Sequence, residues 1–176
     1  MASAGGLHQL IDAHYEALYR YAFRLSGSAA DAEDLTQEAF GKALARLPQL
    51  REPDRAKGWL FRILRNIYLH KVRDQKRHHL VPLDAVGDLP GRESDAVGGA
   101  GGGNGLDIDP AKLQQALDEL DEAFRTPLIL FYFEEFSYKD IAEQMGLPIG
   151  TVMSRLARGK SYLRSRLTPT EAKGAC

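Results

Sequence analysis

The chain has 176 residues, of which 44% are hydrophobic and 27% are charged, and its formal net charge is −1. This composition lies in the range of globular proteins and excludes a chain that is polycationic throughout. The single cysteine excludes a disulfide framework, and no stretch approaches the roughly 18 apolar residues of a membrane span. Because the N-terminus also lacks the pattern of a signal peptide, we expect a cytoplasmic protein with no membrane insertion.

Charged residues are distributed unevenly along the chain. Residues 46–79 contain 10 lysines and arginines against 3 acids, and residues 137–167 contain 6 against 2. Between these segments, residues 80–136 contain 3 lysines and arginines against 12 acids. Two basic segments separated by an acidic one predict two anion-binding surfaces.

The first two predicted elements are helices, and one side of the second is acidic. Apolar residues at spacings of three and four predict helices over residues 7–26 and about 29–47. In the second helix Asp34 and Glu38 lie one turn apart, with Gln37 near the edge of the same side. Two carboxylates at this spacing repel each other unless a cation pairs with them, so we infer a protein partner with a basic helix. The alternative is that acids near the helix start only complement its dipole.

A third helix is predicted from about residue 57 or 59 to about residue 75, and one of its sectors combines an indole ring with cations. That sector contains Trp59, Arg62, Asn66, His70, Arg73 and Arg77. A tryptophan among arginines can stack on an unpaired base or wedge into an opened duplex while the cations hold phosphates. The alternative is a tryptophan packed under the preceding polar loop and covered by arginine stems.

No pattern in the chain predicts catalysis or a cofactor. His70, His78 and His79 are not accompanied by a cysteine or a suitably spaced acid, so no metal site is expected. The sequence contains no Walker motif, serine elbow or metal box. The acids of the second helix also lack a nucleophile, a base or a glycine loop beside them. We therefore expect a protein that is not an enzyme and needs no cofactor.

Helical periodicity stops after the third helix. Residues 80–109 include the stretch AVGGAGGGNG and carry one arginine against six acids. Glycine-rich segments of this kind behave as flexible coils, so this segment is predicted to be an interdomain linker. The chain is thereby divided into a helical domain at residues 7–79, the acidic linker, and a second helical domain at residues 110–168.

The second domain is predicted to contain a helix-turn-helix. Pro110 suits the first turn of a helix, and residues 126–135 are predicted to form an aromatic-rich apolar helix. In the stretch YKDIAEQMGLPIGTVMSRLARGK, Gly146 permits the left-handed backbone that ends one helix, and Pro148 lies at the start of the next. Because no strand pattern is convincing, the predicted fold class is all-α.

The last helix has two faces. Its packing face consists of Val152, Leu156, Gly159 and Leu163. About 110° away, at the helical angle per residue, lie Thr151, Ser154, Arg155, Arg158 and Tyr162, with Lys160 and Arg164 flanking them. Short polar groups and arginines are the residue types that contact base edges and phosphates. The alternative is an ordinary helical hairpin with a solvated basic face.

Together these motifs resemble one family. The order DAEDLTQEAFGKAL, WLFRILRN, a linker and FSYKDIAEQMGLPIGTVMSRLARGKSYLR is similar to that of bacterial ECF (extracytoplasmic function) sigma factors, over about residues 10–166. The resemblance implies an initiation factor that binds core RNA polymerase and reads the −10 and −35 promoter elements. It also implies an anti-sigma factor, because the family usually has one, and a role in stress responses.

The resemblance further implies residue roles. The clamp helices of the largest polymerase subunit would contact Asp34, Gln37, Glu38 and Phe40. The −10 element, melted to single strands, would contact Trp59, Arg62, Asn66, Arg73 and Arg77, and the loop at residues 48–57 would capture a flipped base. The −35 duplex would contact Thr151, Ser154, Arg155, Arg158 and Lys160, in a domain that also meets the flap region of the polymerase.

Two other functional classes stay open at the level of sequence. One is a stand-alone helix-turn-helix regulator that binds duplex DNA as a dimer. The other is an interaction protein whose basic faces are both occupied by protein. Neither class requires Trp59 with its cationic sector or the acidic side that carries Asp34 and Glu38, so these two features favour the sigma factor.

Overall fold

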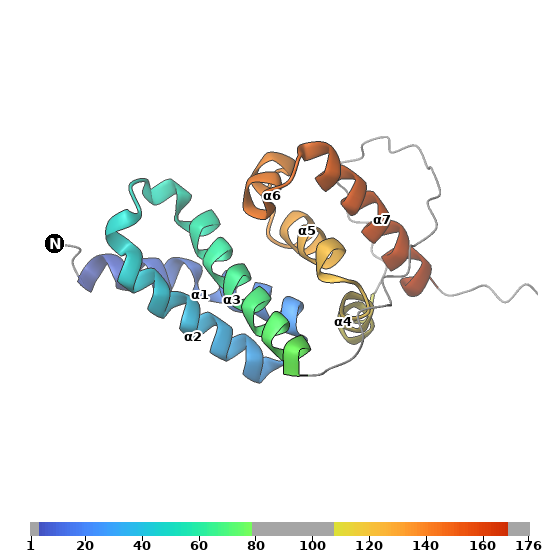
Figure 1. Cartoon of the computed structure of the whole chain (residues 1–176), viewed down its shortest axis with the longest axis horizontal. Helices are drawn as coiled ribbons and strands as arrows, with labels where there is room; N and C mark the ends of the chain where they lie inside the picture. The colour runs from blue at the N-terminus through green and yellow to red at the C-terminus, as the bar shows by residue number, and fades with distance from the viewer. Residues whose placement is uncertain (1–3, 79–107, 169–176) are drawn as a thin grey trace, which may run out of the picture.

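The structure is a computed structural model that describes residues 4–78 and 108–168 (Figure 1). Within those two ranges every regular element is a helix, which confirms the predicted all-α class. In chain order the elements are α1 (Ala4–Ser26), α2 (Ala29–Arg46), the 3₁₀ helices η1 (Leu47–Gln49) and η2 (Pro53–Arg55), α3 (Ala56–His78), α4 (Pro110–Asp118), α5 (Glu122–Tyr132), α6 (Tyr138–Met145) and α7 (Ile149–Leu167). Of the predicted linker, residues 80–107 lie outside the described ranges.

Local signals start and end several helices, and the predicted end of a helix at Gly146 is confirmed. The hydroxyl of Ser28 caps α2 by accepting a hydrogen bond from the backbone N–H of Asp31 at 3.3 Å. Ser137 and Asp140 form a capping box at the start of α6, because each side chain accepts from the other residue's backbone N–H. Gly146 ends α6 with a φ of 65°, in the left-handed region that glycine adopts without steric cost. These signals act over three or four residues, which is why the sequence reveals them.

The helix α5 differs from its prediction over residues 126–135. It begins earlier because the Asp121 carboxylate caps it, accepting a hydrogen bond from the backbone N–H of Ala123 at 2.9 Å. It ends earlier, at Tyr132, and Glu135 adopts a φ of 59° that no α-helix can contain. The acidic pair Glu134 and Glu135 therefore lies on the turn between α5 and α6.

The helices form two bundles, which we call the first bundle (α1–α3) and the second bundle (α4–α7) (Figure 1). The two bundles share one hydrophobic core, since α1 contacts α4 and α5, and α3 contacts α6. The ring of Phe61 lies at the junction: its centre is 4.8 Å from that of Tyr21 and 5.2 Å from that of Phe136 in the second bundle. Burial of such rings stabilises the contact between the bundles.

Polar contacts reinforce the junction at the C-terminal end of α1. The guanidinium of Arg125 donates hydrogen bonds to the backbone oxygen of Leu25 at 2.6 Å and to the hydroxyl of Tyr68 at 3.2 Å. The amide of Gln114 donates to the backbone oxygen of Arg24 at 3.2 Å. The last carbonyls of a helix have no partner within it, so α1 is capped by side chains from the second bundle.

Candidate nucleic-acid interface

The helix-turn-helix is formed by α6 and α7, which pack on α5. Val152 and Leu156 are buried as predicted, and so is Gly159. A Cβ atom added at Gly159 would lie 2.6 Å from Cδ1 of Leu128, so this glycine allows α7 to approach α5 closely. The packing face of α7 is thereby fixed, and the opposite sector of the helix is directed outward.

The predicted DNA-reading sector of α7 is accessible. Ser154, Arg158 and Lys160 are exposed, and Thr151 and Arg155 are half-buried. Within the described residues, none of these three cationic side chains makes a hydrogen bond or an ion pair. The Ser154 hydroxyl donates to the backbone oxygen of Gly150 at 3.0 Å. The cations of this sector are therefore available to an anionic partner.

Tyr162 does not belong to this sector in the structure. Its hydroxyl donates a hydrogen bond to Oε2 of Glu119 at 2.7 Å, and this contact raises the pKa of the Tyr162 hydroxyl. Arg166 also donates to the Glu119 carboxylate. The C-terminal part of α7 thus contacts the residue that follows α4, and the accessible part of the predicted sector is the N-terminal part of α7.

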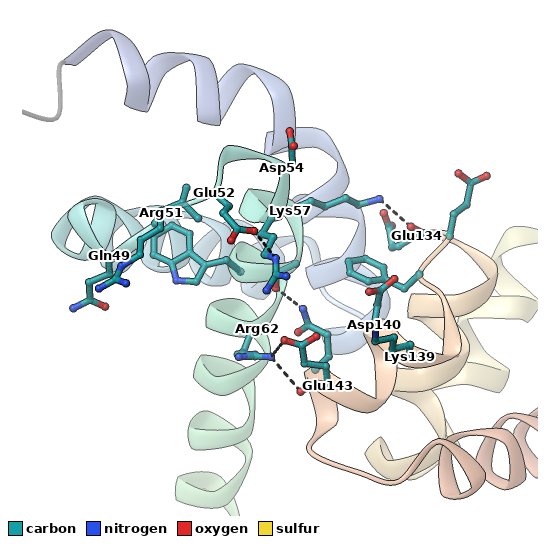
Figure 2. Close-up of a pocket in the computed structure, with 17 residues that line it drawn as sticks. Gln49, Arg51, Glu52, Asp54, Lys57, Arg62, Glu134, Lys139, Asp140 and Glu143 are labelled. Atoms are coloured by element: carbon teal, nitrogen blue, oxygen red, sulfur yellow. Dashed lines mark hydrogen bonds and ion pairs between the residues drawn. The ribbon is translucent and has the colours of Figure 1, made fainter.

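The predicted sector of α3 is only partly available. Asn66, Arg73 and Arg77 are exposed, and Trp59 is half-buried against the shared core. Arg62 is exposed but has a partner in the second bundle. Its Nη2 donates to the backbone oxygen of Glu143 at 3.1 Å and lies 3.8 Å from Oε1 of Glu143 (Figure 2).

A mixed-charge cleft of about 610 Å³ lies between the loop before α3 and the second bundle (Figure 2). Its lining includes the basic residues Arg51, Arg55, Lys57, Arg62 and Lys139 and the acidic residues Glu52, Asp54, Glu134, Glu135, Asp140 and Glu143. The loop at residues 48–57, predicted to capture a base, forms one wall of this cleft. Residues on its two sides contact each other: the ammonium group of Lys57 donates to the backbone oxygen of Glu134 at 2.9 Å.

The acidic side of α2 is exposed at Asp34, Gln37 and Glu38. The Glu38 carboxylate lies 3.0 Å from Nζ of Lys42 and 3.5 Å from Nζ of Lys71, and the hydrogen bond with Lys42 is the main cause of its lowered pKa. The charge of Glu38 is therefore paired with lysines of this chain. Asp34, unlike Glu38, makes no ion pair with any described residue.

Phe40, predicted to lie in the polymerase-binding motif, is only 8% exposed. Its ring stacks on that of Tyr15 in α1, with centres 6.1 Å apart, and Tyr15 is 42% exposed. Tyr15 is thus the aromatic residue that this surface presents, and sequence reasoning missed it. A signal existed, because Tyr15 and Tyr19 have the spacing of a stacked pair along a helix and their ring centres lie 6.4 Å apart.

Two further observations limit the kinds of site that the described residues contain. No three histidine, cysteine, aspartate or glutamate side chains of residues 4–78 and 108–168 are grouped so that they could hold a metal ion. None of the described helices combines the length and the apolar character that crossing a membrane requires.

The fold and the site define an all-α protein that binds nucleic acid through a helix-turn-helix. Two family models match it: Sigma-70 region 2 over residues 10–78 and Sigma-70, region 4 over residues 111–163. The chain is 36% identical to the ECF RNA polymerase sigma factor SigE of Mycolicibacterium smegmatis, over 95% of this chain and 63% of that protein. It is 32% identical to the RNA polymerase sigma factor SigV of Bacillus subtilis, over 88% of this chain and 87% of that protein.

Solved structures agree with these matches. The sigma factor RpoE of Bartonella quintana, in complex with the anti-sigma factor NepR, is 32% identical, with a TM-score of 0.72 over 91% of this chain and 95% of that one. The fold is also that of CnrH in complex with the cytosolic domain of CnrY, at a TM-score of 0.63 and 23% identity, over 93% of this chain and 88% of that one. The chain belongs to the ECF RNA polymerase sigma factors. Sigma factors direct promoter-specific transcription and are not themselves enzymes, and the region 2 match disfavours a stand-alone regulator.

Proposed function

We propose that this chain docks on core RNA polymerase through α2 and reads promoter DNA with two surfaces, the exposed sector of α3 and that of α7. The observation that carries this proposal is the set of cations on α7, which are exposed or half-buried and have no partner among the described residues. Side chains of this kind on the second helix of a helix-turn-helix enter the major groove. The chain would act in the cytoplasm, where the polymerase works.

The −35 element would be read by the N-terminal part of α7. Arg155 and Arg158 would contact guanine edges, since bidentate arginine–guanine pairs are the commonest specific contact in the major groove. Thr151 and Ser154 would contact base edges or phosphates, and Lys160 would contact the phosphate backbone. The helix dipole adds to this attraction, because the positive end of α7 lies at the same turn.

The −10 element would be read and melted at α3. Trp59 is half-buried, so the core would hold the ring in place while the exposed part of the ring stacks face to face on an unpaired base. Arg62 and Asn66 would hold the same strand, and Arg73 and Arg77, which have no partner among the described residues, would contact phosphates. The loop at residues 48–57 would receive a flipped base.

Polymerase docking would centre on Asp34, with Gln37 and Glu38 beside it. Asp34 is supported by its lack of an ion-pair partner within the described residues. Phe40 would act indirectly, because its buried ring supports the exposed ring of Tyr15. A basic helix, such as a clamp helix of the polymerase, would complement this surface, while the second bundle would meet the flap region.

We also propose an anti-sigma factor as a partner of this chain. The support is its likeness to the Bartonella sigma factor, whose solved structure contains the anti-sigma factor NepR. Such a partner would compete with the polymerase for the surface around Asp34.

The test is reconstitution with purified core polymerase. The chain should co-elute with core polymerase at low salt and support run-off transcription from a promoter upstream of its own gene. Asp34→Lys should weaken co-elution, because it places a cation against a basic helix. The matched control is Glu135→Lys, which makes the same change at an exposed acid of the second bundle, away from α2. Absence of polymerase association, or equal loss in both variants, would overturn the proposal.

A further inference from the structure

Two large apolar side chains are exposed at the start of α7. Ile149 is 47% exposed and Met153, one turn later, is 48% exposed. Neither is among the hydrophobic residues that pack against the shared core. A single exposed apolar residue is ordinary, but two residues at a spacing of four form a continuous apolar strip along the helix. The packing of α7 on α5 does not account for this strip.

Met153 borders the sector of α7 that is predicted to read DNA. At the helical angle per residue, Met153 lies about 100° from the buried Val152, and Ser154 lies about 100° further round the helix. Only small residues, Gly150 and Ala157, lie between Met153 and Ser154 on this surface. A Cβ atom added at Gly150 would meet nothing within 4 Å, so this part of the surface is open. The Met153 side chain can therefore extend outward beside Ser154.

The charges around the strip favour a nucleic acid over an apolar protein surface. Residues 149–160 contain three cations and no acid. Two of the cations, Arg158 and Lys160, are exposed and have no partner among the described residues. Lys160 follows Met153 by two helical turns and so lies on nearly the same line of the helix. A partner that fits this surface carries negative charge close to an apolar group.

Duplex DNA presents this combination in its major groove. Phosphates border the groove, and each thymine places its C5-methyl group on the groove floor. A·T pairs show this methyl group there and G·C pairs do not, so an apolar side chain that contacts it selects for a base. Methionine suits such a contact, because its unbranched side chain adapts to the shape of its partner.

We propose that Met153 contacts the C5-methyl group of a thymine in the −35 element and selects for that base. Arg155 and Arg158 select guanines, and Met153 adds a thymine to the sequence that α7 recognises. Ile149 lies closer to the packing face of α7, so Met153 is the member of the apolar strip that faces the groove. This inference rests on the proposed reading of the −35 element by α7.

The test uses the full chain bound to core polymerase and a promoter fragment from upstream of its own gene. Each thymine of the −35 element, on either strand, is replaced in turn by uracil, which lacks only the C5-methyl group. Competition binding at one fixed salt concentration measures the affinity for each fragment.

Wild type should bind one of the uracil fragments about fourfold more weakly than the thymine fragment, which is the factor expected for one methyl-sized group left in water. Met153→Ala should bind the thymine fragment more weakly than wild type and show no difference between thymine and uracil at that position. The two substitutions form a double-mutant cycle, so any effect of uracil that does not involve Met153 cancels.

Three further variants serve as controls. Met153→Leu keeps an apolar side chain of similar volume and should keep the preference for thymine. Lys160→Ala should weaken binding of the thymine and uracil fragments equally, because phosphate contacts carry no sequence information. Ile108→Ala removes another exposed aliphatic side chain, 40% exposed and outside α7, and should match wild type.

The inference would be overturned by a thymine preference that persists in Met153→Ala, or by equal affinity of wild type for every thymine and uracil pair. Loss of core-polymerase affinity in Met153→Ala with unchanged DNA binding would also overturn it, since the strip would then contact protein. Failure of the proposed function is distinguishable, because the wild-type complex would then bind fragments with the native and a scrambled −35 element equally well.

Discussion

The two surfaces proposed to read DNA differ in how the fold treats them. On α7, Arg158 and Lys160 are exposed and have no partner among the described residues. On α3, residues of the same chemical kind are divided, since Arg73 is exposed without a described partner while Arg62 contacts Glu143 of the other bundle. A cationic sector of a helix is therefore not by itself an available binding surface.

The physical reason for the difference is the position of each helix relative to the shared core. The helix α7 packs on α5 through Val152, Leu156 and Gly159, and its polar sector points away from that contact. The start of α3 instead lies at the junction of the bundles, where Phe61 meets Phe136. The start of α3 thus makes contacts within the chain that the outward sector of α7 does not make with any described residue.

The largest expected effect would break the shared core. Phe61→Ala removes a fully buried ring that contacts Tyr21 and Phe136, and such a loss costs about 3–5 kcal/mol of unfolding free energy. Urea denaturation followed by Trp59 fluorescence and by circular dichroism measures it. Tyr15→Ala, which removes an exposed ring, is the control and should cost far less. If Phe61→Ala leaves the free energy of unfolding unchanged, the core at the junction is not formed in solution.

The next largest effect is expected on the exposed surface of α7. Arg155→Ala combined with Arg158→Ala should weaken binding of the polymerase complex to −35 duplex DNA by about 1–3 kcal/mol for each lost base contact. Affinity for core polymerase should not change, because neither side chain lies on α2. Arg46→Ala is the control, since it removes an exposed arginine from the last turn of α2. A loss of polymerase affinity in the double variant would show that α7 has another role.

A third variant changes the start of α3, which lies at the junction of the bundles. Trp59→Ala should slow promoter opening while duplex binding stays close to wild type, since base–aromatic stacking contributes about 1–3 kcal/mol only once bases are unpaired. Permanganate reactivity of unpaired thymines measures opening, and a gel shift of the closed complex measures duplex binding. Trp59→Phe should retain part of the activity. Equal losses of opening and of duplex binding would contradict a stacking role.

The smallest expected effect is a pH dependence at the junction. Glu134 is buried, and its burial raises the pKa of its carboxyl above 4.5, although Arg20, Lys57 and Arg24 oppose the shift and Glu135 adds to it. A carboxyl whose pKa is higher in the folded state than in the unfolded state adds stability at pH values below its unfolded-state pKa. This contribution is lost as the pH rises through the folded-state pKa.

Relative to Glu134→Gln, wild type should therefore lose unfolding free energy as pH rises above 4.5, by at most about 1.4 kcal/mol per pH unit for one proton. Urea denaturation from about pH 4 to about pH 8 measures the difference. Glu135→Gln, at the exposed neighbouring carboxyl, is the control. A wild-type chain that gains stability relative to Glu134→Gln over this range would show that the cations outweigh burial.

Sequence patterns anticipated most helices because their signals are local. Ser28 and Gly146 mark helix ends through bonds within three or four residues, and the burial of Val152 follows from its spacing to Leu156. The prediction over residues 126–135 was wrong because it followed the apolar run and overlooked the cap at Asp121. The residue roles in DNA and polymerase binding stay predictions.

By itself the sequence determined the all-α class, the helix-turn-helix and the faces of its helices, because caps and periodicity depend on neighbours along the chain. Only the tertiary structure decided which residues pack on one another. The ring of Tyr15 stacks on Phe40, Lys71 forms an ion pair with Glu38, and Arg62 donates a hydrogen bond to a backbone oxygen of α6. The partner of Arg62 lies 81 residues away in the chain. No local pattern encodes such a contact, since it forms only when two separately predictable bundles pack together.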